Sequence, residues 1–249
     1  MNAPVATGDG RVVVRREGPV AVVTIDRPAK LNALSTHIET ELSAAVRSDA
    51  VRGAGAVVIT GGDRVFSAGA DTTELAEMTV ESIADYYRGS GSVYEEIGAL
   101  PQPTVAAIAG YCVGGGFELA LATDFRIADP SAVFSLPEVQ IGIVPSSGGT
   151  YRLTQAVGPA RARDLILRGR RMGPDEALSW GLLTSVAEPG EHLADALALA
   201  AELAELPATA VGFAKKLIDH CSDSGRDTGL LLEQLAYAAL GARGERPTS

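Results

Sequence analysis

Basic residues, cysteine and histidine are all scarce in this sequence. The 249 residues include 21 Lys and Arg against 31 Asp and Glu, which gives a formal net charge of −10. Binding to the phosphate backbone of a nucleic acid needs a basic surface, so this charge argues against a nucleic-acid partner. Cys112 and Cys221 are too few for a disulfide scaffold, and a chain of this length buries a core without one. We therefore expect a reducing compartment.

We also expect neither a secretion signal nor a membrane span from this sequence. Residues 1–10 have neither a basic start nor an apolar block. The uncharged stretch Ile97–Phe117 is long enough to cross a bilayer, but it contains Pro101, Pro103 and five glycines, and Glu118 follows at once. A buried strand, a tight turn and the start of a helix explain this stretch better. We expect a cytoplasmic protein without membrane contact.

Several common catalytic patterns are absent as well. His37, His192 and His220 lie in helical patterns away from the glycine-rich segments, so no catalytic role is expected for them. No Cys-x-x-Cys or His-x-x-x-His pair offers a zinc site, and we expect no metal. The segment Gly114–Leu119 lacks the spacing of a dinucleotide-binding loop, and neither a phosphate-binding Gly-Lys-Ser/Thr nor a Gly-x-Ser-x-Gly elbow occurs.

Glycine, by contrast, is plentiful, with 28 residues that gather in clusters beside short apolar runs. These β-branched runs predict buried strands at Val20–Ile25, Ala56–Thr60, Thr104–Ala109 and Phe125–Ala128. Helical patterns lie between them, one capped by Ser35 and one over Val80–Ile97. This alternation, which continues to about residue 145, predicts an α/β domain.

The last third of the chain has a different, mainly helical pattern. Breaks at Gly and Pro separate predicted helices at Gly149–Val157, Ala160–Leu167, Pro174–Trp180, Glu191–Leu206, Thr209–Cys221 and Thr228–Leu240.

Two turns of small residues are the first candidates for chemistry. Ser67–Asp71 follows an apolar strand, and Gly114–Gly116 lies between a strand and a helix. Turns of this kind expose unpaired backbone N–H groups, and a helix start adds positive potential. Two such turns facing one another would form an oxyanion hole, whereas each alone is equally well explained as an ordinary strand-to-helix corner.

Two glutamates in apolar surroundings are the second candidates. Glu118 lies among apolar helix residues, and Glu138 follows Pro137. Burial raises the pKa of a carboxyl group toward neutrality, which suits it to proton transfer. A solvent-facing glutamate at a helix start and a loop glutamate are the alternatives, so neither residue alone assigns a function.

Together these features resemble the crotonase family, the enoyl-CoA hydratase/isomerase superfamily. The resemblance covers about residues 12 to 240. The matching segments, in chain order, are Arg27–Leu34, Phe66–Asp71, Gly110–Ala120, Leu136–Glu138, Gly142–Pro145 and Gly148–Thr150.

The resemblance implies both a fold and an assembly. The fold is an α/β spiral of repeated ββα units, with an acyl-CoA-binding catalytic domain over residues 1–190. Residues 191–249 form a helical region that mediates trimers, usually paired into hexamers.

The resemblance also implies a ligand, an acyl-CoA thioester, in which coenzyme A is part of the substrate and no separate cofactor is used. The N–H groups of Ala68 and Gly115 would form the oxyanion hole. The residues along the CoA arm would be Ala68, Gly69, Ala70 and Asp71. Positive charge near the CoA phosphates would come from Arg27, Lys30 and Arg64.

The resemblance further implies an enoyl-CoA hydratase, because family members with both glutamates are typically hydratases. Glu118 would orient and deprotonate the water that attacks C3 of a 2-enoyl-CoA, and Glu138 would protonate C2. The alternatives are an enoyl-CoA isomerase, other crotonase-type acyl-CoA chemistry, or an acyl-CoA-binding protein without catalysis. The last of these gives no reason for two glutamates in an apolar wall.

The chain departs from the family pattern in three places. Tyr151 replaces a common Gln, and Ser146–Ser147 replace Gly-Ala, both near the expected mouth of the site. After Leu240 the usual Phe and basic segment that helps to hold CoA is absent. The acyl group is not set by these motifs, although three residues of the predicted helix, Tyr86, Tyr87 and Tyr94, are candidates for its pocket as well as for simple packing.

Overall fold

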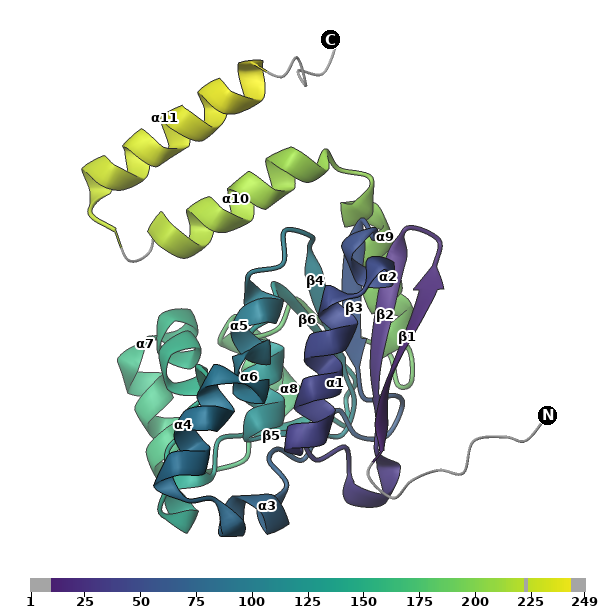
Figure 1. The fold of residues 1–249 in the computed structure, drawn as a ribbon, viewed down its shortest axis with the longest axis vertical. Coiled ribbons are helices and arrows are strands. Elements are labelled where there is room, and N and C mark those ends of the chain that lie inside the picture. The colour runs from purple at the N-terminus through teal and green to yellow at the C-terminus, as the bar shows by residue number, and fades with distance from the viewer. Residues whose placement is uncertain (1–9, 222–223, 243–249) are drawn as a thin grey trace, which may run out of the picture.

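A six-stranded sheet in the order β1-β2-β3-β4-β6-β8 forms the centre of the computed structural model, which describes residues 10–221 and 224–242 (Figure 1). β1 and β2 are antiparallel, and every other neighbouring pair is parallel. The strands of this sheet are β1 (Arg11–Glu17), β2 (Val20–Asp26), β3 (Ala56–Thr60), β4 (Thr104–Ile108), β6 (Phe125–Ala128) and β8 (Ser185–Val186). The four predicted strands are thereby confirmed to within a residue at each end.

A second, two-stranded sheet pairs β5 (Tyr111–Val113) with β7 (Val133–Ser135) in parallel. Ser67 extends it through a bridge to Cys112. The chain passes from β4 in the large sheet to β5 in the small one and then into α6 (Gly115–Leu121), and it repeats the step from β6 to β7. This course confirms the expected α/β architecture of repeated ββα units.

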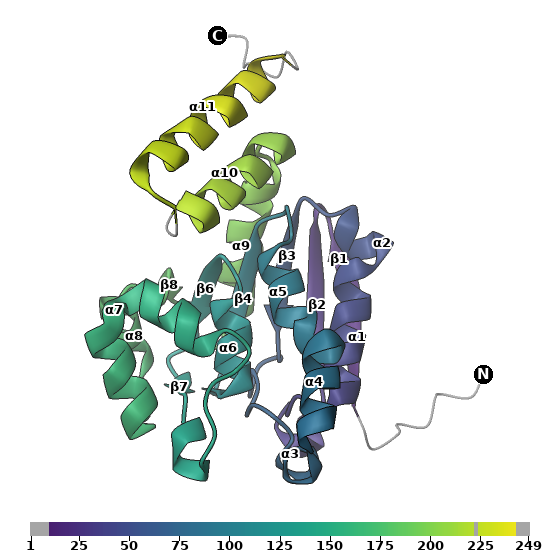
Figure 2. The same cartoon turned by 60° about the vertical axis from the view of Figure 1, so that its left-hand side comes forward.

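Helices cover both faces of the large sheet (Figure 2). In β2, Val23 and Ile25 join the larger core under α1 (Thr36–Arg47), α5 (Val93–Gly98) and α6. Val20 and Val22 join a smaller core on the other face, where α9 (His192–Ala204) packs against β3 and β4. Burial on both faces explains why the strands are continuous apolar runs rather than alternating ones.

Three predicted helices differ from the structure at a glycine. The helix expected over Val80–Ile97 is divided at Gly89, whose ψ of −115° is not helical, into α4 (Val80–Arg88), a short turn and α5. The two helices expected on either side of Gly158 are joined as α7 (Gly149–Arg168), which breaks at that glycine with a φ of +77°. The remaining helical segments are α2 (Asp49–Arg52), α3 (Thr72–Glu77), α8 (Pro174–Ser179), α10 (Ala208–Cys221), α11 (Arg226–Ala242) and the short turns η1 (Pro28–Lys30), η2 (Ser90–Ser92) and η3 (Glu138–Ile141).

The last two helices, α10 and α11, pack on each other at one end of the molecule (Figures 1 and 2), and Lys215 of α10 joins them to the rest through an ion pair of 2.6 Å with Asp124. In α9, by contrast, Ala196 and Ala200 are fully buried against the sheet. Packing therefore changes after α9, while the expected division of the chain between residues 190 and 191 stays a prediction. Most of the segment after Leu240, residues 243–249, and residues 1–9 lie outside the described residues.

The uncharged stretch Ile97–Phe117 contains the end of α5, strands β4 and β5 and the start of α6. This arrangement agrees with the expected strand, turn and helix start. Among the described residues no single helix is long and apolar enough to cross a membrane, and α9 and α10 pass that test only as a pair bent by 109°.

Candidate active site

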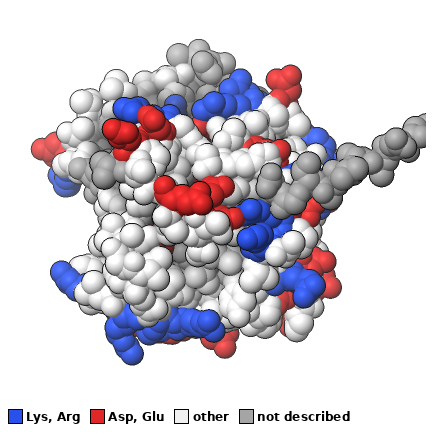
Figure 3. Space-filling model, turned by 60° about the horizontal axis from the view of Figure 1, so that its bottom comes forward, with Lys and Arg blue, Asp and Glu red and all other residues white. Residues whose placement is uncertain are grey.

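A cavity of about 520 Å³ opens at the end of the molecule where α3 and α4 lie. Figure 3 shows this end, with acidic side chains near the middle of the face and basic ones mainly toward its edges. The cavity is lined by both small-residue turns, by Glu118 and Glu138, by α1, α3, α4 and α5, and by the segment 141–147. The structure therefore brings the two candidate turns and the two candidate glutamates to one place.

Close backbone contact between the two turns depends on glycine. Gly69 has a φ of +93°, and a Cβ atom on it would lie 2.7 Å from the carbonyl oxygen of Val113. A Cβ atom on Gly116 would lie 2.6 Å from the carbonyl oxygen of Ser67. Since real Cβ atoms do not approach so closely, any side chain at these positions would push the turns apart.

The amides of the two turns are not equally available. Ala68 N–H donates to the carbonyl oxygen of Leu31 at 3.0 Å, so it is already paired. In the part of the chain that the structure describes, no hydrogen bond is donated by the N–H groups of Ala70 and Gly115. The Ala70 nitrogen lies 3.7 Å from the position of a Cβ atom on Gly115. The geometry thus replaces Ala68 by Ala70 as the candidate partner of Gly115, and Ala68 stays in the cavity wall.

Glu118 is held by two backbone amides. It lies in the first turn of α6 and is 4% exposed. Its Oε1 atom accepts hydrogen bonds from the N–H groups of Ser147 and Gly149, each at 2.8 Å. Burial raises the pKa of this carboxyl group, while the amides of Gly149 and Ser147 oppose the rise. These donors stabilise the ionised form, which is the form that takes up a proton.

Glu138 is held less firmly. It starts the turn η3, is 9% exposed, and its Oε2 atom has no hydrogen-bond partner among the described residues. Burial raises the pKa of Glu138 to about 7, its own backbone amide opposes the rise, and the charge of Glu118 adds to it. The pKa of both glutamates is raised by burial, but only Glu118 has backbone amides of other residues that stabilise its charged form.

A third carboxyl group lines the cavity and was not singled out from the sequence. Glu39 in α1 is 3% exposed, and its Oε1 atom accepts hydrogen bonds from the hydroxyls of Tyr86 at 2.8 Å and Tyr94 at 2.7 Å. Burial raises the pKa of Glu39 to about 7. Glu39 precedes Leu42 by three residues and Val46 by seven, so it lies on the buried face of the helix. This spacing is the feature of the sequence that could have identified Glu39 as a buried carboxyl group.

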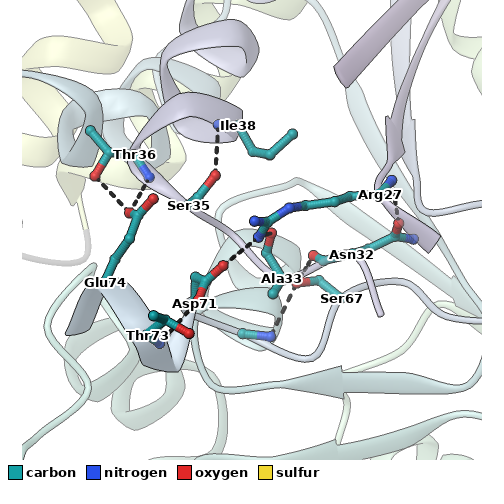
Figure 4. A network of polar contacts seen from close by, with 11 residues as sticks. Arg27, Asn32, Ala33, Ser35, Thr36, Ile38, Ser67, Asp71, Thr73 and Glu74 are labelled. Carbon is teal, nitrogen blue, oxygen red and sulfur yellow. Dashed lines mark hydrogen bonds and ion pairs between the residues drawn. The ribbon is translucent and has the colours of Figure 1, made fainter. Parts of the chain in front are cut away.

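Arg27 is an internal residue. Its guanidinium Nη1 donates to Asp71 Oδ2 at 2.7 Å and to the carbonyl oxygen of Ala33 at 3.1 Å (Figure 4), and Arg27 is 6% exposed. The bond to Arg27 lowers the pKa of Asp71, which also caps α3. The pair ties the turn Ala68–Asp71 to the segment before α1. This burial does not fit the expected contact of Arg27 with CoA phosphates.

The other expected residues lie at the edge of the site. Lys30 and Arg64 are exposed and are not part of the cavity lining. Ser146 and Ser147 do line the cavity, whereas Tyr151 is 52% exposed and outside the lining. Within residues 10–221 and 224–242, no group of three or more His, Cys, Asp or Glu side chains is placed to hold a metal ion.

Comparison with known proteins gives a consistent result. The profile of the enoyl-CoA hydratase/isomerase family matches residues 15–246. A probable enoyl-CoA hydratase from Mycobacterium bovis is 38% identical over 91% of this chain and 88% of that protein. A carnitinyl-CoA dehydratase from Salmonella arizonae is also 38% identical, over 86% of this chain and 82% of that protein. The crystal structure of an enoyl-CoA hydratase from Bacillus anthracis superposes with a TM-score of 0.85 and 34% identity, covering 92% of this chain and 90% of that one.

These matches cover nearly the whole chain. They show that the chain has the crotonase fold and is an enzyme of the hydratase/isomerase type. The chain belongs to the enoyl-CoA hydratase/isomerase family.

Proposed function

We propose that this protein adds water across the C2=C3 double bond of a 2-enoyl-CoA thioester to give a 3-hydroxyacyl-CoA. The observation that carries the proposal is the pair Glu118 and Glu138 in one cavity beside the unpaired amides of Ala70 and Gly115. The similar proteins from Mycobacterium bovis, named a probable enoyl-CoA hydratase, and from Bacillus anthracis, named an enoyl-CoA hydratase, support it. Coenzyme A arrives as part of the substrate, and no separate cofactor takes part.

Glu118 is the base in this proposal. The Ser147 and Gly149 amides leave one carboxylate oxygen, Oε2, for a water molecule. Glu118 takes a proton from this water as its oxygen forms a bond to C3. The C2=C3 electron pair moves toward the thioester carbonyl, whose oxygen becomes the negative enolate oxygen.

The enolate is stabilised by backbone donors and then protonated. The N–H groups of Ala70 and Gly115 donate to its oxygen, an interaction worth ~10²–10³ in rate per donor in other enzymes. Glu138, with a pKa raised to about 7, gives its proton to C2. Transfer of the water-derived proton from Glu118 to solvent and reprotonation of Glu138 complete the cycle, so that one water is consumed for each product.

The main rival is a Δ3–Δ2 enoyl-CoA isomerase. That reaction moves one proton between C2 and C4 and needs no water, so a single carboxyl group is enough. Glu118, fixed by two amides, and Glu138, whose pKa is raised to about 7, favour hydration because they can supply a base and an acid at the same time.

A side-by-side assay of 2-enoyl-CoA and 3-enoyl-CoA thioesters tests the assignment. Hydration of the 2-enoyl substrate is the expected result. Isomerisation of the 3-enoyl substrate without hydration would favour the rival, and binding of both without turnover would favour an acyl-CoA-binding protein.

We propose that α10 and α11 form the contacts between subunits of a trimer or hexamer. Both helices carry exposed apolar side chains, namely Ile218, Leu230, Leu231, Leu235 and Tyr237. Light scattering should give a multiple of three 25.6-kDa chains, and a monomer mass would contradict the proposal. The cytoplasmic location stays a prediction.

A further inference from the structure

Three residues of the cavity wall that the mechanism leaves unused form a hydrogen-bonded cluster. Glu39 in α1, Tyr86 in α4 and Tyr94 in α5 meet there, with both hydroxyls donating to the same carboxyl oxygen. The other oxygen of Glu39, Oε2, is buried and has no partner among the described residues. An unpartnered buried carboxyl oxygen is costly, so the cluster is incomplete within the protein.

The cluster lies beside the reacting centre. The Tyr94 hydroxyl is 3.2 Å from the position of a Cβ atom on Gly115, whose amide belongs to the candidate oxyanion hole. On the other side, Tyr86 lies next to Ser147, the residue whose amide holds Glu118. A substrate with its carbonyl at Gly115 and C3 near Glu118 therefore brings its first acyl carbons to this wall.

The chemistry of the wall separates three kinds of acyl group. No lysine, arginine or histidine of the described residues lines the cavity, while several acids do, so a carboxylate on the acyl chain meets like charge. A plain alkyl chain offers no hydrogen-bond partner to Glu39, Tyr86 or Tyr94, which line the cavity. A hydroxyl both donates and accepts hydrogen bonds, so it pairs with Glu39 whether that group is ionised or protonated.

We propose that Glu39, with the hydroxyls of Tyr86 and Tyr94, selects acyl-CoA thioesters whose acyl group carries a hydroxyl close to the double bond over plain alkyl chains of the same length. The inference rests on the proposed function for the way the substrate lies. A site with a buried polar group discriminates strongly against a ligand that leaves this group unpaired. Glu39 thereby determines specificity without a part in proton transfer to C2 or C3.

A matched set of four-carbon ligands tests the inference. These are trans-2-butenoyl-CoA, trans-4-hydroxy-2-butenoyl-CoA, and the trans-butenedioyl thioester that ends in a carboxylate. Dissociation constants are measured by calorimetry on the full chain with Glu118→Gln, so that binding is read without turnover. The hydroxylated ligand should bind at least ~10-fold more tightly than the plain one, and the carboxylate ligand should bind most weakly.

Substitutions in the same background locate the preference. Glu39→Met should abolish the preference and bind the plain ligand at least as well, whereas Glu39→Gln, which keeps hydrogen-bonding groups, should retain a preference. Glu81→Gln is a control, because Glu81 is an exposed acid in α4. The inference would be overturned if Glu39→Met and Glu39→Gln showed the same preference for the hydroxylated ligand. It would also be overturned if the protein with an intact Glu39 bound the plain ligand more tightly than the hydroxylated one.

A separate turnover assay keeps this inference distinct from the proposed function. Hydration of trans-2-butenoyl-CoA by the unmodified protein, together with no binding preference, defeats only the role of Glu39. A preference that depends on Glu39 with no hydration of any of the three ligands defeats only the hydratase assignment. Failure of all three ligands to bind overturns both.

Discussion

Glu118 and Gly149, 31 residues apart in the chain, are joined by a hydrogen bond of 2.8 Å from the glycine amide to the carboxylate. The glycine also has no room for a side chain on this side, because a Cβ atom would lie 2.7 Å from both Cγ and Oε1 of Glu118. The start of α7 thus sets the position of the candidate base in α6.

The first prediction concerns this contact. Gly149→Ala should displace the Glu118 carboxyl group and lower kcat ~10- to 100-fold, because small errors in the position of a catalytic group are costly. The affinity for an acyl-CoA should change little. The control is Gly173→Ala at the start of α8, where a Cβ atom meets nothing within 4 Å. An unchanged kcat in Gly149→Ala would show that this contact does not position the base.

The second prediction concerns the two glutamates themselves. Glu118→Gln and Glu138→Gln should each lower the hydration rate ~10²-fold or more, since each removes one proton-transfer group. Calorimetry with a saturated acyl-CoA should show nearly unchanged affinity, because glutamine keeps the volume of the side chain. Full turnover in either variant would remove that residue from the mechanism.

The third prediction is a bell-shaped pH dependence of kcat/KM. Glu138 must be protonated to act as the acid, so activity should fall as the pH rises through its pKa of about 7. Glu118 must be ionised, so activity should also fall on the acid side, below its own raised pKa. The two groups interact, so the measured values belong to the pair. A profile that rises steadily from pH ~6 to ~9 would contradict this assignment of acid and base.

The fourth prediction concerns stability and Glu39. The pKa of Glu39 rises from 4.5 to about 7 on folding, so the native state binds this proton more tightly than the unfolded chain. The resulting stability is fully present below pH 4.5 and is lost as the pH rises through about 7. The loss amounts to at most roughly 3 kcal/mol.

Thermal unfolding of the unmodified protein and of Glu39→Gln, measured at pH ~5 and ~8, isolates this effect. Relative to the unmodified protein, Glu39→Gln should gain stability on going to the higher pH. A stability difference between the two proteins that does not change with pH would contradict the burial of an ionisable group at this position.

Local patterns predict much of this molecule and miss the pairings between distant segments. The strands around Val23 and Val58 have continuous apolar runs because both faces of the sheet are covered. The glycine cluster that contains Gly116 predicts a close turn, and the structure leaves no room for a side chain at that position. Glu118 and Glu138 were found because each is a carboxyl group in an apolar segment. Such signals are contained within a few neighbouring residues.

The missed features depend on contacts across the chain. The Ala68 amide is paired with Leu31, which no local pattern around Ala68 indicates, so its neighbour Ala70 is the available donor. Arg27 is a basic residue near the expected CoA site, but its partner Asp71 lies 44 residues away and buries it. Glu39 has the spacing of a buried position, yet its tyrosine partners come from two later helices.

The most direct test of the central claim is to incubate trans-2-butenoyl-CoA with the protein in deuterium oxide and to analyse the product by mass spectrometry and NMR. We predict a 3-hydroxybutanoyl-CoA that carries solvent oxygen at C3 and one deuterium at C2, formed by the unmodified protein and strongly reduced in Glu118→Gln and Glu138→Gln. Incorporation of deuterium at C2 without addition of oxygen at C3 would contradict the account. Hydrated product formed by both variants as well as by the unmodified protein would contradict it too.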